Sequence, residues 1–156
     1  MSVLPAPVSA LELAALEARL QRLEDLQEIT QLLVDYGELL DLRDLDGFAA
    51  LWADDAEFVM STGRTARGRQ AIRDMLAAIM ERSPNAAMHL ETNPRIQLDG
   101  DRATSTIMYA VAFTQPDGLA RITMVGHHHD ELTRTADGWR IHRRHNVVNL
   151  PETGHP

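Results

Sequence analysis

The chain has 156 residues, of which 44% are hydrophobic and 24% charged, and this composition fits one globular domain with a single core. The formal net charge of −8 argues against nucleic acid, because phosphates need a basic surface. The lack of cysteine excludes disulfides and thiolate chemistry, and the lack of lysine excludes a Schiff base. No window approaches the ~20 apolar residues of a membrane span, and the start lacks the basic segment of a secretory signal, so we expect a cytoplasmic protein.

A long helix is expected from about residue 9 to 42, after a flexible tail over residues 1–8. Ser9 and Glu12 have the spacing of a capping box. The apolar positions that follow are first Leu13, Leu16, Leu20 and Leu23, and then, in a shifted phase, Leu26, Ile29, Leu33, Tyr36 and Leu40. The phase change indicates two buried faces. The second should cover a sheet, and the first, in a helical extension over 9–23, should contact a partner subunit.

The remaining elements belong to a domain that we place at 24–150, before a C-terminal tail at 151–156. A short helix capped by Asp44 and reaching Trp52, a brief strand at 57–60, a turn-rich loop and a third helix ending at Ser83-Pro84-Asn85 come first. The period then changes to 2. Strands are predicted at about 86–98, 102–114, 119–134 and 139–149, with Asp/Gly turns between them. Helices followed by an antiparallel meander indicate an α+β fold, with a curved sheet wrapped on the long helix.

Three polar residues are candidates for chemistry. Tyr36 and Asp41 are five residues apart, about 140° on an ideal helix, so they converge only if the helix ends near Asp41. Spacing alone favours a structural role for both. His89 shares one face of its strand with Glu91, and could point to the helix or to solvent. If His89 meets Asp41 in an apolar cavity, the carboxylate would orient the imidazole and make it a general base.

The run of histidines at 127–129 is the other cluster considered. Alternation puts His127 and His129 on one face and His128 on the other. A metal site needs a third ligand and an open pocket, and no second cluster has ligand spacing, so no metal is expected. One inward histidine would instead add polarity to the pocket. The sequence has neither a GK[ST] phosphate loop nor a GxSxG elbow.

Three segments carry a family resemblance. The stretches YGELLDLRDLDGFAALWADDAEF, GRTARGRQAIRDML and DGWRIHRRHNVVNL resemble SnoaL-like proteins of the nuclear transport factor 2-like superfamily. The likeness covers about 24–150 and implies a cone-shaped α+β barrel, in which a curved mixed or antiparallel sheet surrounds the long helix.

Within the superfamily the dehydratase-like branch resembles this chain more than other branches do. Scytalone dehydratase, bile-acid 7α-dehydratase and hexachlorocyclohexane dehydrochlorinase have an aspartate that aligns with Asp41 and a histidine that aligns with His89. The bile-acid enzyme adds a tyrosine placed like Tyr36. Ketosteroid isomerases carry their aspartate on the first strand, where this chain has Met60. The second pocket histidine of scytalone dehydratase has no clear equivalent on the strand of Tyr109.

The resemblance implies a cofactor-independent lyase that eliminates water or another HX from a small apolar cyclic substrate. Tyr36, Asp41 and His89 are the expected catalytic residues, with no metal. The expected pocket residues are Trp52, Phe58, Met60, Tyr109, His128 and His145. Three alternatives stay open: a non-catalytic partner of the ring-hydroxylating dioxygenase β-subunit type, a ligand-binding module, and a polyketide cyclase or isomerase. A homodimer or homotrimer is expected, with neither nucleic acid nor a membrane as partner.

Overall fold

The computed structural model describes residues 9–82 and 87–150, so the predicted tails and the predicted break at Ser83-Pro84-Asn85 lie outside the described residues. The elements are α1 (Ala10–Asp41), α2 (Leu45–Ala50), β1 (Trp52–Val59), β2 (Thr65–Arg67), α3 (Arg69–Arg82), β3 (Ala87–Asp99), β4 (Arg102–Thr114), β5 (Ala120–Thr135) and β6 (Gly138–Leu150). No helix in these two ranges is long and apolar enough to span a bilayer.

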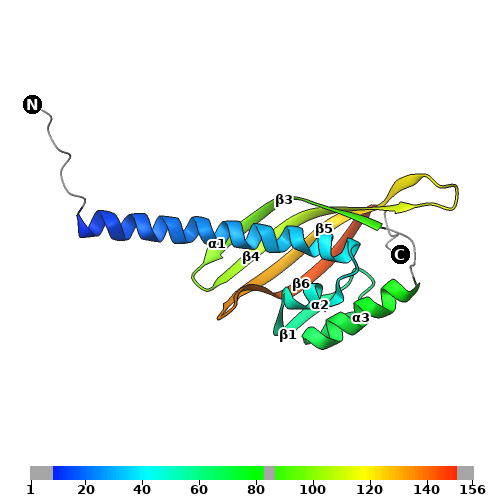
Figure 1. Cartoon of the computed structure of the whole chain (residues 1–156), viewed down its shortest axis with the longest axis horizontal. Helices are drawn as coiled ribbons and strands as arrows, with labels where there is room; N and C mark the ends of the chain where they lie inside the picture. The colour runs from blue at the N-terminus through cyan, green and yellow to red at the C-terminus, as the bar shows by residue number, and fades with distance from the viewer. Residues whose placement is uncertain (1–8, 83–86, 151–156) are drawn as a thin grey trace, which may run out of the picture.

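The long helix is one continuous element that begins as the sequence predicts. Ser9 Oγ accepts the Glu12 backbone N–H at 3.2 Å, and Glu12 Oε2 accepts the Ser9 N–H at 2.9 Å, which completes the capping box. Burial along α1 begins at Asp25. In Figure 1 the N-terminal half of α1 accordingly extends beyond the sheet, and only the second half packs on it.

Asp25 ties α1 to the sheet at the point where burial begins. Its carboxylate accepts two hydrogen bonds from Arg134, at 2.7 and 2.6 Å, and one from the Trp139 indole N–H at 3.2 Å. The Arg134 hydrogen bonds lower the pKa of Asp25 to about 2, although burial acts against them. The Arg134 guanidinium also lies 4.7 Å from the Trp139 ring centroid. These contacts fix the direction in which α1 leaves the sheet.

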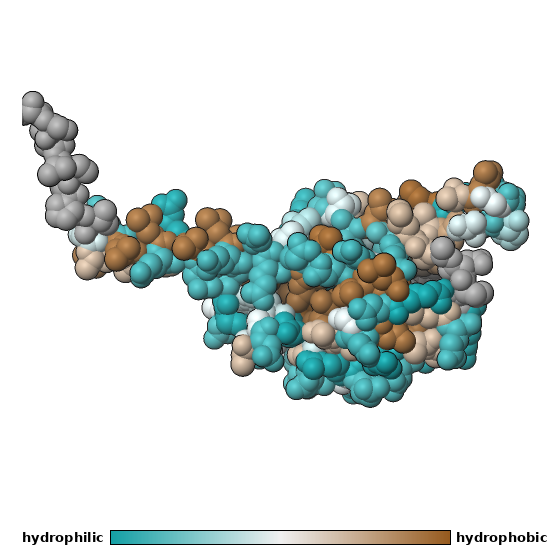
Figure 2. Space-filling view, viewed as in Figure 1, coloured by the Kyte–Doolittle hydropathy of each residue, from teal (hydrophilic) through white to brown (hydrophobic). Residues whose placement is uncertain are grey.

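The helical extension presents an apolar face to solvent. Its five exposed leucines are Leu11, Leu13, Leu16, Leu20 and Leu23, each more than half exposed. Figure 2 shows hydrophobic surface along the free part of the helix. Isolated exposed leucines are ordinary, but a contiguous apolar stripe is typical of an interaction surface. The predicted contact with a partner subunit remains a prediction.

Substitution of leucines in this stripe by charged residues is expected to reduce the oligomeric state. The double variant Leu16→Glu/Leu20→Glu should leave the domain folded, because neither side chain touches the core, while removing apolar area from the expected contact. Light scattering coupled to size-exclusion chromatography should then give a smaller mass than for the wild type. The matched control Glu17→Gln, on the same segment, should keep the wild-type mass. An identical mass for the leucine variant would contradict a subunit contact here.

The strands form one curved, open sheet in the order β2-β1-β6-β5-β4-β3. The pairs β3–β4, β4–β5 and β5–β6 are antiparallel, as the predicted meander requires, whereas β1 pairs with β6 in parallel. The α+β layout is confirmed, although the sheet is not closed into a barrel. The three predicted Asp/Gly turns are also confirmed: Gly100, Gly118 and Gly138 have φ of 56°, 80° and 101°, in the left-handed region that glycine tolerates.

The first strand differs from its prediction at 57–60. It begins at Trp52, which was expected to end the short helix, and its pairing with β6 runs from Trp52 opposite Ile141 to Val59 opposite His145. An irregularity between Trp52 and Glu57 interrupts the register. Asp44 caps α2 as predicted, with its Oδ1 accepting the Gly47 N–H at 2.9 Å. The predicted short helix is too long at its C-terminal end, because Leu51 and Trp52 continue its apolar spacing.

Candidate active site

Asp41 and His89 lie in direct contact where α1 meets β3. The Nδ1 atom of His89 is 2.6 Å from Asp41 Oδ1. Both Asp41 oxygens also accept the His89 backbone N–H, at 3.1 and 2.9 Å. That N–H is free for this bond because β3 is an edge strand. The carboxylate therefore fixes both the backbone and the ring of His89.

Local backbone structure explains how Asp41 reaches β3. Asp41 is the last residue of α1, and Arg43 has a φ of 57°, which turns the chain away from the helix axis. A carboxylate at a helix C-terminus faces the negative end of the helix dipole, which is unfavourable. Hydrogen bonds from His89 offset this cost.

Gly37 allows α1 to approach β3 closely enough for this contact. A Cβ atom at position 37 would lie 3.1 Å from His89 Cβ and 3.2 Å from Glu91 Cγ, tighter than ordinary packing. The YG pair of the sequence thus has two functions. Tyr36 turns into the core, and Gly37 opens the space through which the helix meets the edge strand.

A groove of about 660 Å³ lies beside the Asp41–His89 pair. Its walls come from α1 and β3, and the lining residues are Val34, Glu38, Asp41, Leu42, Met88, His89, Leu90, Glu91 and Thr92. The side chains of Asp41 and His89 are 24% and 19% exposed, so both can be reached from solvent. The groove is open, and not the enclosed pocket that the sequence analysis expected, because β3 has no further strand beside it.

Tyr36 lies in the core and makes contacts different from those of Asp41. Its ring packs at 5.1 Å from Phe48 and 5.3 Å from His128, and the Arg144 guanidinium lies 4.0 Å from its centroid. Burial raises the pKa of Tyr36 to about 12, so the phenol stays protonated near neutral pH. The contacts of the described residues do not include one between Tyr36 and Asp41. Tyr36 and Asp41 therefore do not converge, as their separation of about 140° on an ideal helix predicts.

A buried ion pair occupies the interior beneath Tyr36. Arg144 and Asp130 are fully buried and form two hydrogen bonds, at 2.7 and 2.9 Å, while Ser105 Oγ donates to Asp130 at 2.8 Å. Burial acts to lower the pKa of Arg144, but the Asp130 carboxylate outweighs burial and raises it. Arg144 Nη1 has no hydrogen-bond partner in the described structure. The cation is therefore permanent, and one of its donors is unused.

Glu91, which was not among the predicted site residues, forms a second buried polar pair with His128, which was predicted to line the pocket. Their side chains are 2% and 3% exposed, and His128 Nε2 lies 3.5 Å from Glu91 Oε1. Burial raises the pKa of Glu91 to about 7, and burial lowers that of His128 well below its usual value. The His128 ring stacks on Tyr109 at 4.3 Å. The alternation of β3 already put Glu91 on the face of His89, which was the signal available in the sequence.

Tyr109 is held in place by its neighbours on β5 and β6. Its hydroxyl donates to Asn146 Oδ1 at 2.6 Å, and its ring lies over Gly126, where a Cβ would come within 2.8 Å of two ring carbons. Burial raises the pKa of Tyr109 to about 12. Tyr109 and His128 thus line the interior of the sheet, next to Glu91, and neither lines the groove.

Three other predicted pocket residues are core residues. Trp52 and Phe58 are 0% and 4% exposed, and their rings pack at 5.3 Å. Met60 is partly buried against the same core. The groove contains none of the three among its lining residues. The prediction that they line the pocket beside Asp41 and His89 is wrong, because aromatic packing between α2 and β1 places them in the core.

The prediction that His145 lines the pocket is also wrong. His145 is exposed, and the neighbouring Arg144 points inward instead. In the pairing of β5 with β6, Glu131 faces Arg143 and Leu132 faces Ile141, so no residue of β5 is paired with His142. This β-bulge shifts the alternation by one residue. Trp139 and Ile141 are buried before it, and Arg144 is buried after it.

The histidine run alternates as predicted. His128 is buried, whereas the rings of His127 and His129 stack at 6.2 Å on the opposite face. Within residues 9–82 and 87–150, no three His, Cys, Asp or Glu side chains are grouped so that they could hold a metal ion.

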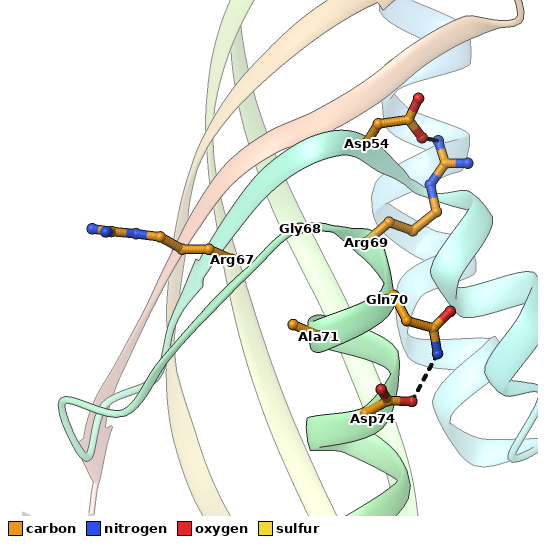
Figure 3. Close-up of a pocket in the computed structure, with 7 residues that line it drawn as sticks. All are labelled: Asp54, Arg67, Gly68, Arg69, Gln70, Ala71 and Asp74. Carbon is orange, nitrogen blue, oxygen red and sulfur yellow. Dashed lines mark hydrogen bonds and ion pairs between the residues drawn. The ribbon is translucent and has the colours of Figure 1, made fainter.

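A second groove, of about 630 Å³, lies at the start of α3 and is shown in Figure 3. Its charged side chains are already paired: Arg69 contacts Asp54 at 3.1 Å, and Gln70 donates to Asp74 at 2.8 Å. Arg67 points away from the other residues drawn and pairs with Glu57 at 2.9 Å. This groove therefore has neither an acid–base pair nor an unpaired charge for chemistry.

Comparison with known proteins identifies the family. Residues 21–145 match the SnoaL-like domain. The chain belongs to the SnoaL-like family. An uncharacterised protein of Mycobacterium tuberculosis is 31% identical over 124 residues, which are 78% of this chain and 84% of that protein.

Solved structures show the same fold. An NTF2-like protein with a cystatin-like fold from Novosphingobium aromaticivorans superimposes with a TM-score of 0.83 and 29% identity over 93% of each chain. A hexachlorocyclohexane dehydrochlorinase superimposes with a TM-score of 0.75, over 85% of this chain and 90% of that one. At 20% identity, the latter likeness shows the fold alone. This fold therefore occurs in a dehydrochlorinase, and a function for this chain has to come from its own residues.

Proposed function

We propose that this SnoaL-like protein is a lyase that eliminates HX, with X a hydroxyl or a similar leaving group, from a small apolar cyclic substrate. The observation that carries the proposal is the 2.6 Å contact between Asp41 and His89 beside a groove large enough for such a molecule. No cofactor is needed, because the step requires only a base, hydrogen-bond donors and a bound substrate.

Asp41 acts on His89 by setting the position of its proton. A carboxylate can only accept a hydrogen bond, so the short contact puts a proton on Nδ1, and in the neutral imidazole the Nε2 lone pair is then free. Nε2 has no hydrogen-bond partner among the described residues. His89 therefore acts as the base that removes a proton from carbon, and Asp41 stabilises the imidazolium that forms.

The groove has the chemistry expected of an apolar substrate site. Val34, Leu42, Met88 and Leu90 line it and are between 42% and 68% exposed, so they offer apolar surface to a ligand. Burial of that surface would bind the ring of the substrate.

Elimination from a pair of simple cyclic ketones tests the proposal. In 3-acetoxycyclohexanone and 3-hydroxycyclohexanone the carbonyl acidifies the proton to be removed, and both compounds give cyclohexenone. We expect the purified protein to accelerate cyclohexenone formation, measured by ultraviolet absorbance, above the rate in buffer. Hexachlorocyclohexane, which tests chloride as the leaving group, completes the panel.

Failure to accelerate any of the three eliminations would contradict the lyase. A tight complex with an aromatic polyketide and its cyclisation would instead identify a cyclase. Stable association with an iron–sulfur subunit, without any turnover, would identify a non-catalytic partner of the dioxygenase β-subunit type. These outcomes separate the alternatives that share the fold.

A further inference from the structure

The free edge of β3 presents backbone groups as well as side chains to the groove. In an antiparallel sheet the N–H and C=O groups of successive residues point alternately toward the neighbouring strand and away from it. The N–H of His89 points away from β4, since Asp41 accepts it. The C=O of His89 also points to this edge, because its oxygen lies 3.6 Å from the position that a Cβ of Gly37 would take. Residues of β3 that are two positions apart share this direction.

Glu91 has the same backbone orientation as His89. The register between β3 and β4 is regular at this place, with His89 opposite Val111 and Glu91 opposite Tyr109, and the irregularity in it comes only after Thr92. The N–H and C=O groups of Glu91 therefore also point to the open edge. About 7 Å along the strand separate the N–H groups of residues 89 and 91. In the part of the chain that the structure describes, a side chain accepts the first of them but not the second.

The exposed part of Glu91 is its backbone. The residue as a whole is partly exposed and lines the groove, whereas its side chain is 2% exposed. The buried carboxyl does not reach a molecule in the groove, so the groups that Glu91 offers there are those of the main chain. Its N–H is thus a hydrogen-bond donor on the groove wall, and its acceptor has to come from solvent or from a ligand.

We propose that the backbone N–H of Glu91 donates a hydrogen bond to the carbonyl oxygen of the substrate and stabilises the negative charge that develops there. This inference rests on the proposed lyase and supplies the oxyanion donor of that reaction. A backbone donor that is fixed in place before the reaction stabilises such charge without reorganisation.

The base and the donor lie at the same section of the edge. Asp41 Oδ1 contacts both the backbone N–H and the Nδ1 atom of His89, at 3.1 and 2.6 Å, so the imidazole ring stays on the edge side of the strand. The N–H of Glu91 follows on the same edge. A small ring in the groove can therefore present a C–H bond to His89 and the neighbouring carbonyl oxygen to Glu91. Val34 and Leu42 on α1 form the apolar wall across from them.

The step balances without any further reactant. The C–H bond next to the carbonyl breaks, its proton goes to His89 Nε2, and its electron pair moves onto the carbonyl oxygen to give an enolate. The Glu91 N–H donates a hydrogen bond to this oxygen and keeps its own proton. The carbonyl then re-forms with a new C=C bond as the C–O bond breaks, and the leaving group departs with that electron pair. The His89 imidazolium returns its proton to the leaving group, which gives HX and the neutral base.

Titration with an unreactive ketone tests the hydrogen bond without any turnover. In nitrogen-15 correlation NMR spectra of the wild type, cyclohexanone should move the amide proton of Glu91 downfield in a saturable manner, because a carbonyl acceptor deshields it. The amide of Leu90, which points to β4, should move little. Methylenecyclohexane has the same ring without the oxygen. It should shift the amides of Val34 and Leu42 but should not move that of Glu91 downfield.

Removal of this one N–H tests its part in the reaction. An ester in place of the amide between Leu90 and Glu91 deletes the donor and keeps both side chains. We expect kcat/KM to fall by about 10²-fold on both 3-acetoxycyclohexanone and 3-hydroxycyclohexanone, because charge develops on the same oxygen in each. The same replacement before Leu11, whose N–H lies in the first turn of α1 and has no intrahelical acceptor, should change the rate by less than about twofold. Circular dichroism checks the fold of both variants.

Each outcome decides the role of this N–H. Saturable shifts at Val34 and Leu42 without a downfield shift of the Glu91 amide would overturn the hydrogen bond, as would an ester variant with wild-type rates. If the ester variant does not fold, the titration decides alone. A wild type that converts neither ketone would contradict the lyase, and the catalytic role of the N–H with it, whatever the titration shows.

Discussion

The variant His89→Gln is expected to lose elimination activity almost completely, with kcat/KM lower by about 10²–10⁴-fold on both cyclohexanones. Glutamine fills similar space but cannot accept a proton. The backbone N–H of residue 89 can still donate to Asp41, so the contact between α1 and β3 should persist. Steady-state kinetics by absorbance of cyclohexenone provides the measurement, and circular dichroism checks the fold.

His129→Gln is the matched control for this variant. The same substitution is made on the outer face of β5, where the ring contacts Thr106 at 3.3 Å, so activity should stay at the wild-type level. Asp41→Asn should give an intermediate loss, because the ring would lose its anion but keep its general position. Wild-type kinetics for His89→Gln would exclude His89 as the base, whatever the other variants do.

The variant Asp130→Asn is expected to destabilise the fold by about 3–5 kcal/mol, because it leaves the Arg144 cation buried without its anion. The two residues are 3% and 0% exposed, so water cannot solvate the remaining charge. The free energy of unfolding, measured by urea titration, should show a loss of this size. Asp137→Asn, in the exposed turn between β5 and β6, is the matched control and should change stability by less than about 0.5 kcal/mol.

A double-mutant cycle separates the ion pair from its surroundings. Arg144→Met alone leaves an anion buried beside Ser105 and should also be costly. The double variant Asp130→Asn/Arg144→Met has no buried charge at this place and should lose clearly less than the sum of the two single changes. Additive losses would contradict a strong coupling between Asp130 and Arg144.

Much of the fold could be predicted because its signals are local. The capping box at Ser9, the Asp44 cap and the Asp/Gly turns depend on residues within a few positions of one another. The alternation of His127, His128 and His129 depends only on strand geometry. The ends of β3 to β6 were accordingly predicted within one or two residues. The strand β2 was missed in a segment predicted to be a loop, and the start of β1 was missed because Trp52 continues a helical pattern.

The candidate site could be predicted only in part, since it depends on contacts between distant segments. Glu91 was visible on the face of His89, but a glutamate in a strand is usually solvated, and its burial results from the close approach of α1 at Gly37. The bulge at His142 has no clear sequence signal, and it turns Arg144 inward in place of the predicted His145. The burial of Glu91 depends on helix packing, and the inward position of Arg144 depends on strand register. The hydrophobic pattern of the sequence specifies neither.

The residues that hold the proposed base differ from those that would bind the substrate. The end of α1 supplies Asp41 and the free edge of β3 supplies His89, so one helix–strand contact assembles the proposed base and the carboxylate that orients it. The polar pairs Arg144–Asp130 and His128–Glu91 are buried in the interior of the domain. Exchange of the apolar groove residues, such as Val34 or Leu42, would then alter the substrate without disturbing the chemistry, which fits a fold shared by proteins of different activities.

The primary deuterium isotope effect on kcat/KM is the most direct test that His89 removes hydrogen from carbon. It is measured with 3-acetoxycyclohexanone carrying deuterium at carbon 2, where the proton is lost. We expect an isotope effect well above one for the wild type, and for His89→Gln only the slow background reaction. An isotope effect of one, together with a rate that does not depend on His89, would contradict proton abstraction by this residue.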